Sequence, residues 1–212
     1  MSGQMWVWVV LAGLAVLLWA ERAENSKVKA VAKPIASTAF IAEAVAFGAG
    51  TTRWGQVLLV ALAFCWLGDV LLLSRKDKLF LGGLVAFLLG HVGYAVMFVM
   101  LGLDTTWLMG GGVFVLVVLP IVAKWVLPNV KGSMKGPVVA YMVVISAMVA
   151  LAAGCAGHTD RLIFLVAAVM FFVSDLAVAR DRFVSPGFPN RLWGLPLYYV
   201  AQILFAATPG SP

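Results

Sequence analysis

The chain has 212 residues, of which 63% are hydrophobic and 11% are charged. A soluble domain of this length could not cover so much apolar surface with polar groups, so the composition excludes a water-soluble protein and indicates an integral membrane protein. The net charge is +6. The basic residues fall in short connections between apolar runs, which suits contact with membrane lipid and gives no indication of nucleic-acid binding.

Eight apolar runs have about the length that a membrane-spanning helix requires, which is roughly 20 residues. They lie near residues 5–20, 32–50, 55–73, 80–101, 108–127, 137–156, 160–179 and 192–208. The connections between them are too short to separate two domains. We therefore predict an all-α, polytopic membrane bundle of eight transmembrane helices, which makes residues 1–212 a single transmembrane domain.

The basic residues are concentrated in alternate connections. The first, third, fifth and seventh connections carry Arg22, Lys27, Lys29, Arg75, Lys76, Lys78, Lys131, Lys135, Arg180, Arg182 and Arg191. The even-numbered connections carry Arg53 and Arg161 alone. Because Lys and Arg are retained in the cytoplasm, this asymmetry predicts that the odd-numbered connections are cytoplasmic and that both termini are extracytoplasmic.

The two halves of the chain share a weak repeat. Gly68-Asp69 near the end of the third run corresponds to Ser174-Asp175 near the end of the seventh, with an offset of 106 residues between the aspartates (175 minus 69). Two further pairs recur at similar offsets: Lys33-Pro34, which we expect to open the second helix, with Lys135-Gly136-Pro137, and Tyr94 with Tyr198 and Tyr199. Four runs per unit give both halves the same orientation, which favours a 4+4 parallel internal repeat.

Two carboxylates are expected inside the membrane at one depth. Asp69 and Asp175 each lie roughly 7 Å inside the cytoplasmic end of their helix, at a rise of about 1.5 Å per residue. A charge at this depth is costly unless it is paired, hydrated or neutralised, so an intramembrane carboxylate is a candidate functional residue. Lys33 is expected at a similar level. The matching depths predict a shared polar cavity in which protons are transferred.

Three further polar residues are expected near the bilayer midplane. Counted from the starts of their runs, Glu43, His91 and Gln202 each lie roughly 15 Å into the membrane. Tyr94 shares a helical face with His91, and Tyr198 lies one turn nearer the cytoplasm than Gln202. We expect these side chains to line the deeper part of one pocket that opens to the cytoplasmic leaflet.

Five short motifs follow one another along the chain. They are Lys33-Pro34, Gly68-Asp69, Gly90-His91 with Tyr94, Ser174-Asp175, and Tyr198 with Gln202. Their order and spacing, from the second to the eighth run, resemble the pattern of the YhhN-like integral membrane proteins, the lysoplasmalogenases. The resemblance implies an eight-helix ether hydrolase that cleaves the vinyl ether bond of lysoplasmalogen. Its products would be a fatty aldehyde and glycerophosphocholine or glycerophosphoethanolamine.

The resemblance also implies where the protein lies, because members of the family are bacterial inner-membrane or endoplasmic-reticulum proteins. A composition rich in Ala, Val and Gly, together with short connections, favours the bacterial inner (cytoplasmic) membrane. The expected partners are the lysophospholipid substrate and the surrounding membrane lipid. The sequence indicates no oligomeric state.

The implied reaction assigns roles to the intramembrane residues. Protonation of the β-carbon of a vinyl ether gives an oxocarbenium ion, to which water adds, and two carboxyl groups share comparable work in glycoside cleavage. We therefore predict Asp69 and Asp175 as the catalytic pair, with His91 relaying protons or orienting the water. The predicted substrate-binding residues are Lys33, Glu43, Tyr94, Ser174, Tyr198, Gln202, Arg75 and Arg180. The basic members of this set, with Arg191, would hold the phosphate.

Other uses of the same residues remain open. Asp69, Asp175 and His91 are the one conceivable set of metal ligands, but no metal-binding motif accompanies them, so we expect neither a metal nor another cofactor. A small proton-coupled transporter would also need intramembrane acids, usually beside broken helices. In a non-catalytic lipid-binding protein, Asp69 would merely pair with Lys33 or Arg75.

Overall fold

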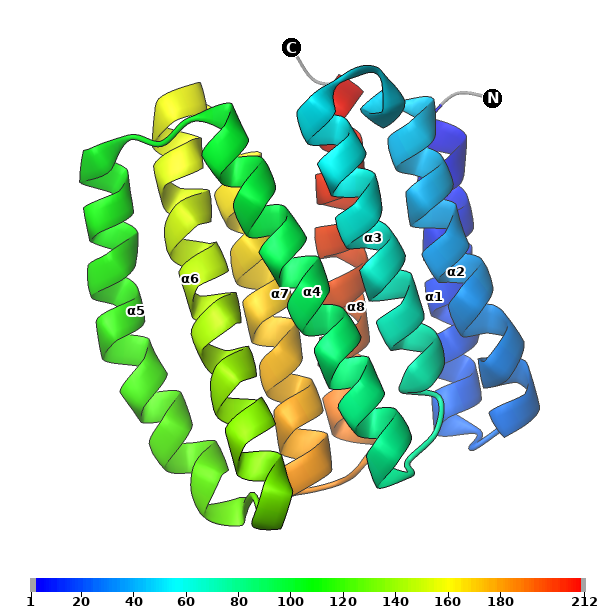
Figure 1. Ribbon diagram of the computed structural model, residues 1–212. Coiled ribbons are helices and arrows are strands. Elements are labelled where there is room, and N and C mark those ends of the chain that lie inside the picture. The colour runs from blue at the N-terminus through cyan, green and yellow to red at the C-terminus, as the bar shows by residue number, and fades with distance from the viewer. Residues whose placement is uncertain (1–2, 211–212) are drawn as a thin grey trace.

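The computed structural model describes residues 3–210, which form eight long α-helices and no strand. The helices are α1 (Gly3–Arg22), α2 (Ser26–Ala46), α3 (Arg53–Leu71), α4 (Asp77–Leu101), α5 (Thr105–Val126), α6 (Lys135–Thr159), α7 (Ile163–Ala179) and α8 (Phe188–Ala207) (Figure 1). One helix forms over each of the eight apolar runs. The predicted all-helical fold is therefore confirmed.

Six of these helices, α1 and α3 to α7, are long and apolar enough to cross a membrane. The other two, α2 and α8, have 21 and 20 residues but include buried polar and charged side chains, among them Lys33 and Glu43 in α2. Along α5, large apolar side chains face outward, and Leu116 is 74% exposed. Such a surface suits lipid rather than water, and the protein is a multi-pass integral membrane protein.

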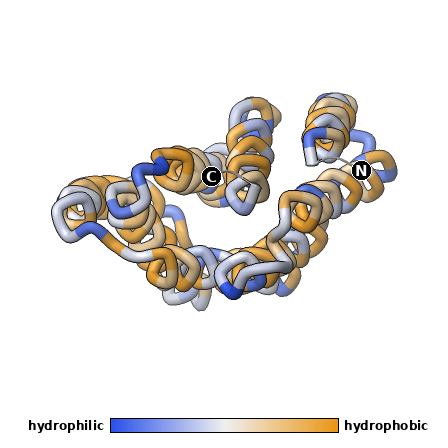
Figure 2. Tube along the Cα trace, turned by 90° about the horizontal axis from the view of Figure 1, so that it is seen from above, coloured by the Kyte–Doolittle hydropathy of each residue, from blue (hydrophilic) through white to orange (hydrophobic). Residues whose placement is uncertain are grey.

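The helices form a closed ring with one helix outside it. Neighbours pack in the order α1, α2, α3, α4, α6, α7 and α8, and α8 packs back onto α1 and α2. α5 packs mainly on α6 and lies at one edge of the molecule in both views (Figures 1 and 2), and hydrophobic residues make up much of the trace in Figure 2. The ring brings α3 and α4 of the first half against α8 and α6 of the second.

Two helices begin earlier than the sequence pattern predicts. α2 starts at Ser26, where the side chain of Asn25 accepts a hydrogen bond from the Val28 amide at 3.1 Å. Pro34 therefore lies inside α2 and does not open it, so that prediction is wrong. α8 starts at Phe188, with Pro189 in the first turn, where proline needs no amide partner.

The earlier start of α2 changes the depth of one predicted site residue. Seventeen residues separate Ser26 from Glu43, which is about 26 Å along the helix. Glu43 is three residues from the last residue of α2, so it lies towards the opposite end of the bundle from the start of α2, not at mid-depth.

The first and last described residues lie at the same end of the bundle (Figure 1). The opposite end holds the connections 23–25, 72–76, 127–134 and 180–187. We call it the pocket end, because the pocket described below lies there. Asp69 lies two residues before the end of α3 and Asp175 four residues before the end of α7, so both are near it.

A close approach of two helices fixes one wall of that pocket. A Cβ added to Gly68 of α3 would lie 2.5 Å from the ring of Phe87 on α4, so only glycine leaves room for this ring. Gly194 of α8 packs closely against Ala177 of α7 in the same way, because a Cβ added to Gly194 would come within 2.5 Å of the alanine Cβ. These contacts hold α3 against α4 and α7 against α8 next to the two aspartates.

Candidate active site

A single pocket at the pocket end is lined by both Asp69 and Asp175. It holds about 1120 Å³ of space free of protein atoms, part of which is open to the outside. Most of its lining is apolar and comes from α2 to α8. The polar side chains of the lining are Lys33, Asp69, Tyr141, Ser146, Ser174, Asp175, Asn190, Arg191 and Tyr198. An apolar cleft with a few convergent polar groups is the usual form of a ligand site.

Asp69 is surrounded by donors. Its Oδ1 lies 3.0 Å from the Lys33 ammonium, and its Oδ2 accepts hydrogen bonds of 2.6 Å from both Ser37 and Tyr198. The side chain is 2% exposed. A carboxylate can be kept in apolar surroundings when it is paired and each oxygen accepts a donor, and these contacts meet both conditions. Tyr199 adds support through a 3.3 Å contact with Ser37.

A chain of buried hydrogen bonds runs from Asp69 into the bundle. Tyr198 donates to Asp69 and accepts a bond of 3.2 Å from the Gln202 amide. Tyr94 donates to the Gln202 carbonyl at 2.6 Å. The Cys65 sulfur lies 3.9 Å from the Tyr94 hydroxyl. Gln202 and Tyr94 thus lie behind the pocket wall, where they fix the position of Tyr198.

Asp175 has a different environment. Its Oδ2 accepts a hydrogen bond of 2.5 Å from Tyr141 and lies 3.2 Å from Nε2 of His91. The Tyr141 hydroxyl also lies 3.3 Å from the same His91 nitrogen. His91 is fully buried, whereas the Asp175 side chain is 15% exposed. Within residues 3–210, no hydrogen bond reaches the Asp175 Oδ1, so this oxygen is free to meet a ligand in the pocket.

The two carboxylate networks are separate but adjacent. The ring of Phe171 lies between them, with its centroid 4.6 Å from that of His91 and 5.2 Å from that of Tyr198. Phe87 packs edge-on against both Phe171 and Tyr198. The aspartates therefore share a pocket while each keeps its own hydrogen-bond partners.

The two networks are built in the same way. Asp69, on α3, is bound by the preceding helix α2 and by α8 of the other half. Asp175, on α7, is bound by the preceding helix α6 and by α4 of the other half. Ser37 and Tyr141 are offset by 104 residues (141 minus 37), close to the offset of 106 between the aspartates.

The predicted site residues fall into three groups. Lys33, Asp69, Ser174, Asp175 and Tyr198 line the pocket. His91, Tyr94 and Gln202 are buried behind it and bonded to residues that line it or to one another. The remaining three, Glu43, Arg75 and Arg180, are not part of its lining. The Ser174 hydroxyl donates to the carbonyl of Phe171 in its own helix.

Glu43 is separated from the other predicted residues. Both of its carboxyl oxygens are buried and have no hydrogen-bond partner among the described residues. The sequence placed it beside His91 and Gln202 because the start of α2 was placed too late. The structure therefore does not bring Glu43 to the pocket.

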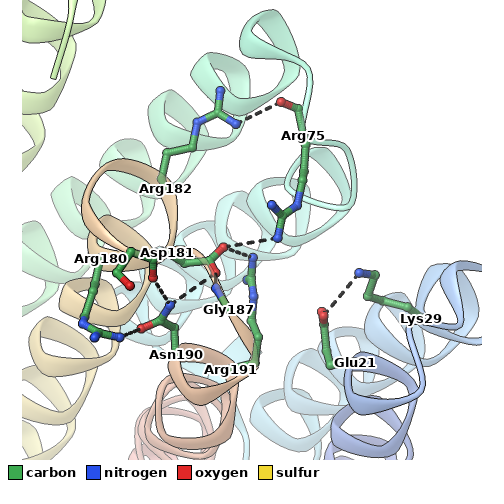
Figure 3. A network of polar contacts seen from close by, with 10 residues as sticks. Glu21, Lys29, Arg75, Arg180, Asp181, Arg182, Gly187, Asn190 and Arg191 are labelled. Atoms are coloured by element: carbon green, nitrogen blue, oxygen red, sulfur yellow. Dashed lines mark hydrogen bonds and ion pairs between the residues drawn. The ribbon is translucent and has the colours of Figure 1, made fainter. Parts of the chain in front are cut away.

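A charged cluster closes the pocket end (Figure 3). Asp181 is buried and accepts from Arg191 at 2.7 Å and from the Gly187 amide at 3.0 Å. Arg75 approaches the same carboxylate at 3.7 Å, and Arg180 donates to Asn190 at 2.5 Å. Arg75 and Arg180, predicted to bind substrate, thus belong to this cluster.

Two residues in or beside the site could not be recognised from the sequence. Tyr141 contacts both Asp175 and His91, but a single tyrosine in an apolar run has no motif around it. Its spacing from Ser37, which nearly repeats that of the aspartates, was the one available signal. Asp181 has no such signal, because an aspartate in a connection is ordinary, but the structure buries it in a π-helical turn at Arg180–Val184.

No group of three or more His, Cys, Asp or Glu side chains within residues 3–210 is arranged to hold a metal ion. Asp175 and His91 contact each other, whereas Asp69 binds Lys33, so the three conceivable ligands do not converge on one point.

Comparison with known proteins relates this fold to a family. The family model of the YhhN family matches residues 28–208. The bovine (Bos taurus) lysoplasmalogenase TMEM86A is 31% identical over 157 residues, which cover 70% of this chain and 63% of that protein. The chain thus spans less than two thirds of this curated relative. No solved structure matches the chain. The match over residues 28–208 includes every residue of both carboxylate networks, and the chain belongs to the YhhN family.

Proposed function

We propose that the protein is a membrane enzyme that hydrolyses the vinyl ether bond of lysoplasmalogen to a fatty aldehyde and glycerophosphocholine or glycerophosphoethanolamine. One observation carries the proposal. Asp69 and Asp175 line the same largely apolar pocket, and one oxygen of Asp175 has no hydrogen-bond partner within residues 3–210, in a chain of the YhhN family. The relative named lysoplasmalogenase supports the choice of substrate.

The proposal includes a membrane topology. All eight helices span the membrane as one domain, with the pocket end in the cytoplasm and both ends of the chain outside. The basic connections of the pocket end support this orientation, because Lys and Arg are retained in the cytoplasm. The matching construction of the two carboxylate networks supports a 4+4 parallel repeat. We place the protein in a bacterial inner membrane on its composition and short connections.

The chemistry begins with proton transfer to carbon. A carboxylic acid gives its proton to the β-carbon of the vinyl ether, and the double-bond electrons form the new C–H bond. The α-carbon becomes an oxocarbenium ion. Water then adds to it and loses a proton to the carboxylate, and the hemiacetal breaks its C–O bond to release aldehyde and alcohol. The acid is regenerated, as when one carboxyl serves in turn as acid and base in glycoside hydrolysis.

Asp175 is the group that we assign to this proton transfer. Its Oδ1 has no hydrogen-bond partner within the described residues, and its side chain reaches the pocket. Tyr141 and His91 both contact Oδ2, so they hold the carboxyl in one orientation and direct Oδ1 towards the substrate. His91 is fully buried, which favours a positioning role over direct contact with lipid.

Asp69 is assigned a different part. Because Lys33, Ser37 and Tyr198 occupy both of its oxygens, it stays a charged acceptor and does not donate a proton. It fixes the ammonium of Lys33 and the hydroxyl of Tyr198, which both line the pocket. Because the one O–H of Tyr198 is donated to Asp69, we expect Tyr198 to meet the substrate with its ring, and the Asp69 carboxylate to favour the developing cation.

The hydrocarbon chain of the substrate fits the apolar part of the lining. Phe87, Phe172, Leu84, Leu119 and Val122 contribute to it. Burial of methylene groups against such residues favours binding by about 0.8 kcal/mol for each CH₂. A lysolipid held this way has its scissile bond at the pocket end, near the two aspartates.

Replacement of Asp175 by Asn tests the proposal. Asn keeps the shape of the side chain but cannot protonate carbon, so aldehyde release from lysoplasmalogen is expected to fall by about 100-fold or more. Purified protein in detergent micelles would be assayed by mass spectrometry of the trapped aldehyde. Asp160→Asn is the matched control, because Asp160 is exposed at the other end of the bundle. Full activity of Asp175→Asn would refute the assignment.

The transporter interpretation has less support. Transport sites of this kind usually lie beside broken helices. α3 and α7, which carry the two aspartates, each run as one continuous helix, over Arg53–Leu71 and Ile163–Ala179. The continuity of these two helices therefore favours a fixed catalytic pocket.

A further inference from the structure

The pocket end carries a surplus of positive charge. The segments 75–78 and 180–191 contain six basic residues, Arg75, Lys76, Lys78, Arg180, Arg182 and Arg191. They contain two acidic residues, Asp77 and Asp181, so four positive charges remain (six minus two). Such a surplus at the opening of an apolar pocket attracts an anion.

Only one of these six basic side chains lines the pocket. Arg191 is part of the lining, together with its neighbour Asn190. Its side chain is 25% exposed, so it is packed over most of its surface but still accessible in part. Arg191 and Tyr198 are seven residues apart on α8, close to two helical turns, and therefore lie on the same face about 10 Å apart.

One hydrogen bond holds Arg191 in place, and most of its N–H donors remain available. Its Nη2 donates to the Asp181 Oδ2 at 2.7 Å, which is its one hydrogen bond to the described residues. A guanidinium has five N–H donors, so four are left for a ligand. Asp181 is itself fixed, because its Oδ1 accepts from the Gly187 amide at 3.0 Å and from Asn190 at 3.4 Å (Figure 3).

The π-helical turn Arg180–Val184 explains how Asp181 reaches this position. The Ser185 amide donates to the Arg180 carbonyl at 2.7 Å and closes the wider turn. The turn places Asp181 on the inside, where it is buried, while Arg182 beside it pairs with Asp77. Single π turns in helical proteins are frequent at functional sites.

The other arginines of the cluster do not line the pocket, and two of them bind other protein groups. Arg180 donates to the side chain of Asn190, and Arg182 donates to the Arg75 carbonyl at 2.9 Å. Both therefore hold the connections together. Arg75 is 73% exposed and approaches Asp181 at 3.7 Å without a hydrogen bond. It adds positive charge at the opening, and a loose, exposed pair of this kind is held weakly.

From these contacts we propose that Arg191, aimed by Asp181, binds the phosphodiester of a one-chain glycerophospholipid at the opening of the pocket. The planar fork of arginine matches two phosphate oxygens, which a lysine ammonium does not. A phosphate bound here directs the attached chain along α8 past Tyr198 and towards the aspartates. The proposal rests on the proposed function for its substrate class, and it makes the pocket selective for lysophospholipids over uncharged one-chain glycerolipids.

Binding of non-reactive lipids tests the proposal without any catalysis. Wild-type protein in maltoside micelles would be titrated with lysophosphatidylcholine and with a monoacylglycerol of the same chain, using calorimetry. We expect lysophosphatidylcholine to bind about 10- to 100-fold more tightly, and Arg191→Gln to lose this preference, since one charge-assisted contact accounts for a difference of that size. Lys78→Gln removes a charge at the same end but not from the pocket, and is expected to keep the preference.

Kinetic measurements distinguish a role of Arg191 in phosphate binding from a role in catalysis. With lysoplasmalogen, Arg191→Gln is expected to raise KM by about 10-fold or more, and to lower kcat/KM far more than it does for the uncharged alkenylglycerol. Asp181→Asn, which loosens Arg191, should give the same selective loss to a smaller degree. Arg191→Lys should recover part of the preference, because it restores the charge without the fork.

Each outcome has one meaning. Retention of the phosphate preference by Arg191→Gln overturns the proposal. If millimolar inorganic phosphate competes for the site as effectively as lysophosphatidylcholine does, the ligand is free phosphate and not the lipid headgroup, and the proposal is overturned. If the preference for lysophosphatidylcholine depends on Arg191 but no lysoplasmalogen is hydrolysed, the binding site stands and the proposed function fails.

Discussion

At the level of single residues, the two aspartates differ in how many of their oxygens are occupied by donors. Asp69 accepts from three side chains and is almost fully buried, whereas Asp175 lines the pocket and has one oxygen with no hydrogen-bond partner among the described residues. An acid can transfer a proton only through an oxygen that reaches the substrate. The matching sequence motifs Gly68-Asp69 and Ser174-Asp175 therefore lead to different environments and, in our proposal, to different roles.

Tyr141 provides a prediction at this level. Its hydroxyl donates to the Asp175 carboxyl at 2.5 Å and would stabilise the carboxylate that forms when Asp175 gives up its proton. Tyr141→Phe should therefore lower kcat for aldehyde release by roughly 10- to 100-fold. Tyr94→Phe is the matched comparison, because the Tyr94 hydroxyl also lies in the bundle but donates to Gln202 and not to an aspartate. Equal losses in the two variants would argue against a special role for Tyr141.

The sequence identified site residues where a polar side chain inside the membrane is costly. Asp69, Asp175 and His91 could be identified because charged or polar side chains in apolar runs require a reason. Tyr141 and Asp181 could not, because a tyrosine is tolerated almost anywhere in a membrane helix and an aspartate in a connection is ordinary. Their importance comes from partners on other helices, which a single sequence does not reveal.

At the level of helices, all eight were predicted, but two starts were misplaced. The first residues of α2 include Lys27 and Lys29, so hydrophobicity alone does not mark them as helical, and Pro34 was taken for the start. The Asn25 side chain accepts from the Val28 amide and the Asn25 carbonyl accepts from the Lys29 amide, which lets the helix begin in a polar segment. This difference moved Glu43 away from the site.

Helix packing next to the aspartates gives a second prediction. Gly194→Ala would bring a methyl group within 2.5 Å of Ala177 and push α8 from α7. Overpacking of this kind costs about 1–3 kcal/mol, so the melting temperature and the activity should both fall. Gly112→Ala on α5 is the control, since nothing lies within 4 Å of an added Cβ there. A melting temperature unchanged by Gly194→Ala would show that the two helices separate at little cost.

At the level of the whole molecule, the ring of helices brings the two halves of the chain together around one pocket. Each aspartate is bound by a helix of its own half and by a helix of the other half. The sequence repeat indicated two equivalent positions, but not which helices become neighbours. The position of α5 outside the ring, packed mainly on α6, had no signal in the sequence either.

The orientation of the ring in the membrane can be tested by labelling. The native cysteines, Cys65 and Cys155, are buried, so single added cysteines can be followed in the natural background. In intact bacterial cells, a membrane-impermeant maleimide should label Asp160→Cys directly and Lys131→Cys only after the cells are permeabilised. Direct labelling of Lys131→Cys would place the pocket end outside the cytoplasm and contradict the proposed topology.

The central claim is that Asp175 protonates the β-carbon of a vinyl ether in the shared pocket. The most direct test is hydrolysis of lysoplasmalogen in D₂O with immediate reduction of the aldehyde and mass spectrometry of the alcohol. Our account predicts one deuterium at the carbon next to the former carbonyl, at a rate that depends on Asp175. Aldehyde released without deuterium at that carbon, or at an unchanged rate from Asp175→Asn protein, would contradict it.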